Sequence, residues 1–168
     1  MNVTIREYQD RDLESCKHLW RELTQRHRDI YLDQSIGGED PGIYFERYLK
    51  KTNLAGPWVA EEGSTIVGMA GLLMDGEEAE IEPIVIRSEF RSRGVGSLLI
   101  EKLKTEAKER RVDYLSIRPV ARNVEAIQCF HRAGFSLLGQ IDMFIDLTEE
   151  SDEGWKDGIT IHGHAFRY

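Results

Sequence analysis

A chain of 168 residues, of which 40% are hydrophobic and 31% charged, has the size and composition of one globular domain with a sizeable core. The net charge of -8 disfavours a binder of nucleic acid or of anionic membranes, because such polyanions need a basic surface. No apolar run approaches the roughly 18 residues of a membrane span, and the first residues lack the apolar stretch of a secretory signal. We therefore expect a single domain over residues 1–168 in a soluble, cytoplasmic protein, with Cys16 and Cys129 as reduced thiols.

The first 50 residues predict one strand and two helices. Residues 3–8 alternate between apolar and polar types, as a strand does. Asp10 or Asp12 then suits the N-cap of a helix with apolar residues at helical spacing, and a second helix is expected after Pro41. Between these helices, Gly37-Gly38 breaks the chain, either as a mobile loop beside a substrate or as an ordinary connector.

The middle of the chain predicts an antiparallel meander followed by a parallel crossover. Two strands meet in a hairpin about Glu62-Gly63, and the turn at Asp75-Gly76 leads into a third strand over residues 80–86. An apolar helix face over residues 95–107 then precedes a buried strand over 112–117, which we expect to lie parallel to residues 80–86.

The last 45 residues predict a short helix and further strands. Asn123 suits the N-cap of that helix and Gly134 its end. Residues 135–147 alternate cleanly, which predicts a strand with one buried face and completes a core domain over residues 1–147. Residues 148–168 are expected to be an extension, with an acidic solvated stretch and then a strand that is added to the sheet or joins two subunits in a homodimer.

The stretch Arg91-Ser92-Arg93-Gly94-Val95-Gly96 lies between a strand and a helix, and its glycines let several N–H groups point at one spot before the helix begins. The helix dipole and the two arginines add positive charge there, so a phosphate or pyrophosphate is the ligand that this turn would best satisfy. The alternative is a glycine-containing turn with its arginines in solvent. The stretch matches neither the dinucleotide fingerprint nor the P-loop, which indicates another kind of phosphate site.

Together with Asn123-x-x-Ala126-x-x-x-Phe130-x-x-x-Gly134-Phe135, the motif Arg91-x-x-Gly94-x-Gly96 resembles the GNAT superfamily of acetyl-CoA-dependent N-acyltransferases. The resemblance covers roughly residues 58–147. It implies an α/β (α+β) fold with a mixed, mostly antiparallel twisted sheet, a central parallel strand pair that splays apart, and helices on both faces. It also implies acetyl-CoA as co-substrate, without a metal.

The same resemblance assigns the residues that would hold the co-substrate. The main chain of Ile84, Val85 and Ile86 would pair with the pantetheine arm as an added strand does. Asn123 and Phe130 would contact the co-substrate from the following helix, although the capping role of Asn123 alone could explain that residue. The pyrophosphate would lie on the N–H groups that follow Arg91, those of Ser92, Arg93, Gly94, Val95, Gly96 and Ser97.

Two glutamates are candidates for the catalytic base. Glu80 matches the place of a base in some members of the family, whereas Glu82 is nearer the expected thioester. Pro83 cannot donate to a ladder and indicates a bulge or a splayed edge at this point of the strand. The alternative interpretation is that both glutamates are ordinary solvent-facing residues.

Phe130 occupies the position where many members carry a tyrosine that protonates the leaving thiolate. Water, Tyr114 or a residue of the extension would then supply that proton. The sequence thus predicts transfer of an acetyl group to a primary amine, such as a protein N-terminus, a lysine or a small molecule. A non-catalytic acyl-CoA-binding or sensing module is the alternative, and the acceptor itself is not specified.

Overall fold

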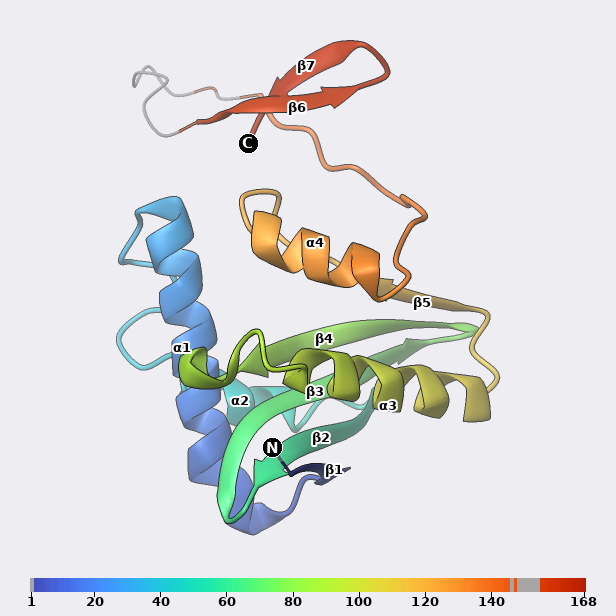
Figure 1. Cartoon of the computed structure of the whole chain (residues 1–168). Helices are drawn as coiled ribbons and strands as arrows, with labels where there is room; N and C mark the ends of the chain where they lie inside the picture. Colours follow the sequence, from blue (N-terminus) through green and yellow to red (C-terminus); the bar gives the residue numbers. More distant parts are fainter. Residues whose placement is uncertain (1, 146, 148–154) are drawn as a thin grey trace.

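A computed structural model describes residues 2–145, 147 and 155–168 of the chain (Figure 1). Five strands form one sheet in the order β1-β2-β3-β4-β5, and a second sheet contains only β6 and β7. The strands are β1 (Val3–Glu7), β2 (Leu54–Glu62), β3 (Thr65–Asp75), β4 (Glu78–Ile86), β5 (Tyr114–Ile117), β6 (Asp157–Ile161) and β7 (His164–Arg167). The helices are α1 (Leu13–Tyr31), α2 (Ile43–Tyr48), α3 (Val95–Glu109) and α4 (Val124–Arg132), with short 3-10 turns at Asp10–Asp12 and Ser88–Phe90.

The large sheet is the predicted mixed sheet. The pairs β1-β2, β2-β3 and β3-β4 are antiparallel, and β4-β5 is parallel, from Glu78 opposite Tyr114 to Ile81 opposite Ile117. The two predicted hairpin turns connect β2 to β3 and β3 to β4. Helix α3 supplies the crossover from β4 to β5, as the order strand, helix, strand requires for a parallel pair.

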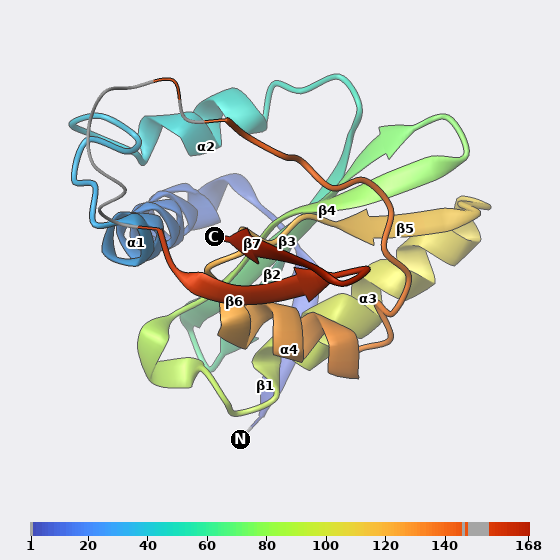
Figure 2. The ribbon, with the colours of Figure 1, turned by 90° about the horizontal axis from the view of Figure 1, so that it is seen from above.

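Helices cover both faces of this sheet (Figures 1 and 2). Leu99 and Leu103 of α3 pack against one face, in a cluster with Trp58, Val67 and Leu72 of the strands. Cys16 and Leu19 of α1 pack with Phe45 and Tyr48 of α2 against the other face, together with Val59, Met69 and Val85. Alternate residues of each strand therefore enter two separate apolar layers, which is why the strands are hydrophobic on both sides.

The start of α1 differs in detail from the prediction. Asp10–Asp12 form a 3-10 turn, and the helix begins at Leu13. The Asp12 carboxylate makes no cap to the first amides of the helix, since it accepts hydrogen bonds from the backbone of Gln9 and from the Arg6 guanidinium instead. Asp12 thus fastens the end of β1 to the first helix.

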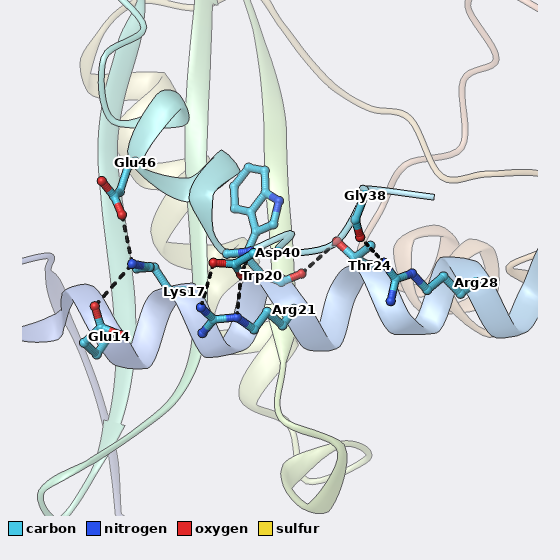
Figure 3. A network of polar contacts seen from close by, with 10 residues as sticks. Glu14, Lys17, Trp20, Arg21, Thr24, Arg28, Gly38, Asp40 and Glu46 are labelled. Carbon is cyan, nitrogen blue, oxygen red and sulfur yellow. Dashed lines mark hydrogen bonds and ion pairs between the residues drawn. The ribbon is translucent and has the colours of Figure 1, made fainter. Parts of the chain in front are cut away.

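The chain between α1 and α2 is tied to α1 (Figure 3). Arg21 forms an ion pair with Asp40 at 2.9 Å, and Arg28 donates a hydrogen bond to the Gly38 carbonyl at 2.6 Å. One turn before Arg21 in α1, Lys17 forms an ion pair with Glu46 of α2 at 2.9 Å. These contacts favour the second alternative for Gly37-Gly38, an ordinary connector that is fixed on both sides.

The prediction of a strand over residues 135–147 is wrong for this structure. Residues 136–145 and 147 are exposed and belong to no helix or strand, while residue 146 lies outside the described residues. The alternating pattern indicates residues that suit a strand, but a strand also needs a neighbouring edge, and this segment lies next to none in its own chain.

The extension forms strands, but they pair with each other in the β6-β7 hairpin and add no strand to the large sheet. Most of the predicted acidic stretch, residues 149–154, lies outside the described residues. No helix in the described part of the chain combines the length and the apolar character that a membrane crossing requires.

Candidate active site

Strands β4 and β5 separate at the position that the sequence predicted. Their pairing ends at Ile81 and Ile117, and beyond this point β4 pairs only with β3. In the β3-β4 ladder, Ala70 lies opposite Ile84 and Leu72 lies opposite Ile81. Between these two pairs β3 contributes a step of two residues and β4 a step of three. This irregularity is a bulge at Glu82-Pro83, and it confirms the prediction made from Pro83.

The bulge changes which residues of β4, odd-numbered or even-numbered, point to each face of the sheet. Before it, Ala79 and Ile81 pack in the cluster under α3, and after it Ile84 and Ile86 pack on that same side, whereas Val85 belongs to the cluster under α1 and α2. Without the extra residue, odd and even positions would have kept their sides along the strand.

A cleft of about 740 Å³ lies beside the free part of β4. Its walls come from β4, from the turn of residues 91–97, from α3 and α4, and from two residues of α1. Most residues that the sequence assigned to the co-substrate line this cleft: Ile84, Val85, Ile86, Arg91, Ser92, Gly94, Gly96, Ser97, Asn123 and Phe130.

Two of the assigned residues turn their side chains elsewhere. The Arg93 guanidinium carbon lies 5.3 Å from the centre of the Phe90 ring, and the residue does not line the cleft. The Val95 side chain is 1% exposed and packs in the core. At both positions only the main chain remains available to the turn.

The turn of residues 91–97 presents a set of unused donors. Ser92 and Gly94 both adopt left-handed backbone, with φ of 57° and 84°. Within the described residues, the N–H groups of residues 92–97 meet no backbone or side-chain acceptor, and α3 has no side-chain N-cap. Amides left unpaired at a helix N-terminus are suited to an anion, and the cleft gives a phosphate access to them.

Arg91 contributes a full positive charge beside these amides. Its Nε donates a hydrogen bond of 3.2 Å to the Ile86 carbonyl, which holds the guanidinium at the end of β4 and in the wall of the cleft. The glycines of the turn differ in role. Gly94 needs its positive φ, whereas Gly96 is helical and a Cβ there would lie 3.8 Å from the Ile86 side chain, an ordinary contact.

Helix α4 forms the opposite wall. The Asn123 side chain accepts a hydrogen bond of 3.2 Å from the Ala126 amide, so the predicted N-cap is confirmed and the residue also lines the cleft. Phe130 makes an edge contact with Phe135, with ring centres 6.3 Å apart. No hydroxyl group therefore stands at this place in the wall.

Sequence reasoning missed the contributions of α1 and part of α4. Leu23 and Arg26 line the cleft from α1, and Arg26 forms an ion pair of 2.8 Å with Glu125 of α4, 99 residues away. Cys129 also lines the cleft. Leu23 and Arg26 are three residues apart, so they share a helix face, but only the packing of α1 against the sheet decides what that face meets.

The two candidate bases lie close to the separation of the strands, outside the residues that line the cleft. Glu80 pairs with Arg118, which follows β5, and its side chain is 17% exposed. Glu82 pairs with Lys51 at 3.0 Å and is 43% exposed. Each carboxylate is thus paired with its own cation, on the face of the sheet opposite α3.

Solved structures with the same fold include one in complex with a coenzyme A derivative. A transcriptional regulator from Bacillus halodurans is 26% identical, with a TM-score of 0.64 over 85% of this chain and 100% of that chain. AAC(6')-Iy, solved with the bisubstrate analogue CoA-S-monomethyl-acetylneamine, is 15% identical, with a TM-score of 0.65 over 87% of this chain and 99% of that chain. The ribosomal-protein-S18-alanine N-acetyltransferase from Escherichia coli is 17% identical, with a TM-score of 0.62 over 79% and 77%.

No curated protein matches the chain. The family model for the acetyltransferase (GNAT) family, in contrast, matches residues 14–135, which contain the separated strands, the turn of residues 91–97 and α4. The cleft and its unpaired amides lie within this match. The chain belongs to the GNAT family of acetyltransferases, enzymes that in general transfer an acetyl group from acetyl-CoA.

Proposed function

We propose that the protein is an N-acetyltransferase that moves the acetyl group of acetyl-CoA to a primary amine. The observation that carries this proposal is the set of unpaired N–H groups at residues 92–97, at the end of a cleft beside the free part of β4. The pyrophosphate of acetyl-CoA would accept hydrogen bonds from these amides, with Arg91 as an additional cation. No metal takes part in this mechanism.

The pantetheine arm would run along the free edge of β4. Its amides would pair with the main chain of Ile84, Val85 and Ile86, which have no partner strand on that side, as a peptide does in β-augmentation. Asn123 and Phe130 would contact the arm from α4. This path leads the thioester from the turn toward the point where β4 and β5 separate.

The chemistry is direct attack. The uncharged amine forms a bond to the thioester carbonyl carbon, a tetrahedral oxyanion results, and the C–S bond breaks to release the CoA thiolate. A main-chain N–H of β4 beside the thioester would stabilise the oxyanion. The thiolate takes its proton from water, because alkyl thiols ionise near pH 8.5 and such a leaving group does not require an enzymatic acid; Tyr114 does not line the cleft.

Glu82 is our choice for the base that accepts the proton of the amine. It follows Ile81, the last residue of β4 that pairs with β5, so it lies where the thioester path ends. Glu80 lies within the paired part of β4 and is held by Arg118, which suits a residue that positions the strand ends. A base at this place contributes about 10²-fold to 10⁴-fold to the rate.

A cationic acceptor fits this side of the sheet. Glu77, Glu78, Glu80 and Glu82 supply four carboxylates against the two cations Arg118 and Lys51, and the whole chain carries a net charge of -8. Among the solved structures, AAC(6')-Iy binds an analogue that contains acetylneamine, and the enzyme from Escherichia coli is an N-acetyltransferase of S18 alanine. We therefore propose a protonated small-molecule amine or the N-terminus or lysine of a peptide, and a cytoplasmic location, where acetyl-CoA is available.

The test has two stages. Calorimetry with acetyl-CoA should give binding that is weakened at least ~10-fold, or about 1.4 kcal/mol, by Arg91→Ala. Thiol release should then be measured with a panel of spermidine, an aminoglycoside, an alanine-initiated peptide and a lysine peptide blocked at its N-terminus. Absence of acetyl-CoA binding would overturn the proposal. Binding without thiol release on any amine would favour the alternative, a module that senses acyl-CoA without catalysis.

A further inference from the structure

A second pocket, of about 390 Å³, lies beside the co-substrate cleft. Its walls come from the end of α1, from Arg122 in the loop before α4, and from Trp155 and Lys156 just before β6. This volume is near the lower limit for small-molecule sites, so the pocket accommodates one functional group of a ligand rather than a whole co-substrate.

Arg122 has a buried donor that is not used within the chain. Its Nε is inaccessible to solvent and, in the described part of the chain, has no hydrogen-bond partner. Trp58 Nε1 and Arg87 Nε share this condition, but these two residues line neither the cleft nor the second pocket. Because burial of a donor without an acceptor is unfavourable, an unpaired nitrogen in the wall of a pocket indicates that a ligand supplies the acceptor.

Two aromatic rings hold the Arg122 guanidinium in place. Its central carbon lies 4.9 Å from the centre of the Tyr31 ring and 5.4 Å from the centre of the Trp155 ring. The loop beneath it is also fixed, because the Asn123 amide donates a hydrogen bond of 2.9 Å to the Val120 carbonyl. A ring face offers no lone pair, so the N–H fork of the guanidinium remains available for a carboxylate or a phosphate, whose geometry it matches.

The pocket also has more positive than negative charge. Its acidic residue Asp29 accepts a hydrogen bond of 2.8 Å from Gln25, and Arg26 is neutralised by its ion pair with α4. Arg122 and Lys156, in contrast, form no ion pair with any part of the chain that the structure describes. In a chain with 30 acidic and 22 basic residues, two neighbouring cations without a carboxylate are suited to an anion from outside.

The second pocket adjoins the cleft on the side of the pantetheine arm. Arg26 lines both spaces, and Arg122 directly precedes Asn123, which lines the cleft and would contact that arm. Of residues 91–97, which would hold the pyrophosphate, none lines the second pocket. The pocket is therefore placed for the second substrate rather than for the nucleotide end of the co-substrate.

The β6-β7 hairpin supplies the outer wall. It lies over α4, and its first strand begins beside the end of α1 (Figures 1 and 2). Lys156 is fixed in this hairpin, because its main chain exchanges two hydrogen bonds of 2.8 Å with Tyr168. The extension thus completes the pocket, although it adds no strand to the large sheet.

We propose that this pocket binds an anionic group of the acceptor, which is then an amine that also carries a carboxylate or a phosphate, such as an amino acid or a peptide with a free acid. The inference rests on the proposed acetyl transfer. Arg122 would bind the anion through its N–H fork, Lys156 would add charge, and Ile30 and Leu32 would contact the neighbouring carbon atoms. The protonated amino group would lie on the acidic side of β4, where Glu82 accepts its proton.

Matched acceptors that differ only in the anion test the proposal. The pairs are alanyl-phenylalanine and its C-terminal amide, Nα-acetyl-lysine and its amide, and ethanolamine phosphate and ethanolamine. Thiol release reports turnover, and calorimetry on the full chain saturated with CoA reports binding. In at least one pair, the anionic member should exceed the other ~10-fold in kcat/KM and in affinity, which corresponds to about 1.4 kcal/mol. Preferred binding of an anion without thiol release would support the pocket and contradict the acetyl transfer.

Substitutions of the two cations test which residues bind the anion. Arg122→Gln should remove the preference for the anionic member, and Lys156→Gln should reduce it about threefold, because Lys156 adds charge without the planar fork. Arg47→Gln is the matched control and should keep the preference. The Arg47 guanidinium carbon likewise lies 5.0 Å from an aromatic ring centre, that of Tyr44, but the residue lines neither the cleft nor the pocket. Unchanged thermal unfolding of the three variants would show that each fold is intact.

The 3′-phosphate of acetyl-CoA is the competing source of an anion, and acetyl-CoA without this phosphate distinguishes the two. If the acceptor supplies the anion, Arg122→Gln should leave the dissociation constants of both forms within about threefold of wild type. The proposal is overturned if Arg122→Gln weakens acetyl-CoA at least ~10-fold and spares the dephosphorylated form, because the co-substrate then fills the pocket. It is equally overturned if no anionic member is preferred in turnover or in binding, or if Arg122→Gln keeps the preference as fully as Arg47→Gln does.

Discussion

The Tyr48 hydroxyl donates a hydrogen bond of 2.5 Å to the main-chain carbonyl of Glu82, so the end of α2 is fastened to the bulge of β4. Tyr48 is buried, and burial together with the nearby Glu82 raises the pKa of its phenol, which keeps it a donor at all physiological pH values. This contact connects α2 with the strand that lines the cleft. It also depends on a glycine, because a Cβ on Gly71 would lie 1.9 Å from the Tyr48 oxygen.

Gly71→Ala should therefore destabilise the protein by about 1–3 kcal/mol, as overpacking in a core does. Tyr48→Phe should cost about 1 kcal/mol through the lost hydrogen bond. In the double variant the added methyl no longer meets a hydroxyl, so the loss should be smaller than the sum of the two single losses. Urea unfolding of the four proteins measures this coupling, and strictly additive losses would contradict the stated contact.

Substitutions at the two glycines of the turn should change different properties, the stability of the protein at Gly94 and its affinity for CoA at Gly96. Gly94→Ala places a side chain at φ 84° and should lower the free energy of unfolding by about 1–2 kcal/mol. Gly96→Val leaves helical backbone and adds a branched side chain whose Cβ would make an ordinary contact with Ile86 at 3.8 Å, so stability should be unchanged or higher. Its effect should appear in calorimetry as affinity for CoA reduced at least ~10-fold. Leu98→Ala, on an exposed position of the same helix outside the cleft, is the control for affinity.

The two glutamates near the separation of the strands should differ in turnover. Glu82→Gln should lower kcat about 100-fold or more at neutral pH, with little change in the dissociation constant of acetyl-CoA, because the base acts on the amine. Glu80→Gln should retain kcat within about tenfold, since we assign it a positioning role through Arg118. The reverse order of the two effects would make Glu80 the base.

Asp12 should make stability dependent on pH. Hydrogen bonds from the Arg6 guanidinium hold the pKa of this buried carboxyl below its ordinary value of 3.8. A lowered pKa in the folded state means that the ionised group stabilises the fold above the ordinary pKa, and that this contribution is lost as the pH falls through the lowered value. Asp12→Asn should thus cost about 2 kcal/mol at pH 7, and the difference from wild type should shrink below about pH 4.

Urea unfolding between pH 2.5 and pH 7 measures this effect. Asp10→Asn is the matched control, because Asp10 is exposed in the same 3-10 turn and should show little difference from wild type at any pH. A deficit for Asp12→Asn that stays constant down to pH 2.5 would contradict the lowered pKa.

Local sequence determined much of the candidate site. Gly94 and Gly96 before an apolar helix predicted unpaired amides, Pro83 predicted the bulge at which β4 leaves β5, and Asn123 predicted the start of α4. Each of these features depends on the conformational limits of one residue or on hydrogen bonds within a few residues along the chain. Such features are visible in a sequence.

Only the tertiary structure decided which side chains share the cleft. Arg93 stacks outward on Phe90 and Val95 enters the core, while Arg26 of α1 and Cys129 of α4 face the same space. These outcomes depend on how α1, α3 and α4 are rotated against the sheet, a balance of packing between residues far apart in the chain.

Residues 137–145, which we call the arm, illustrate the same division. Its alternating residues predicted strand character, and sequence alone could not provide the edge that a strand must pair with. In the folded chain the arm stays exposed and β5 keeps a free edge, because a ladder forms only where two backbones meet in space. The residues thus determine the local conformation that a segment prefers, and the arrangement of the whole molecule determines its partner.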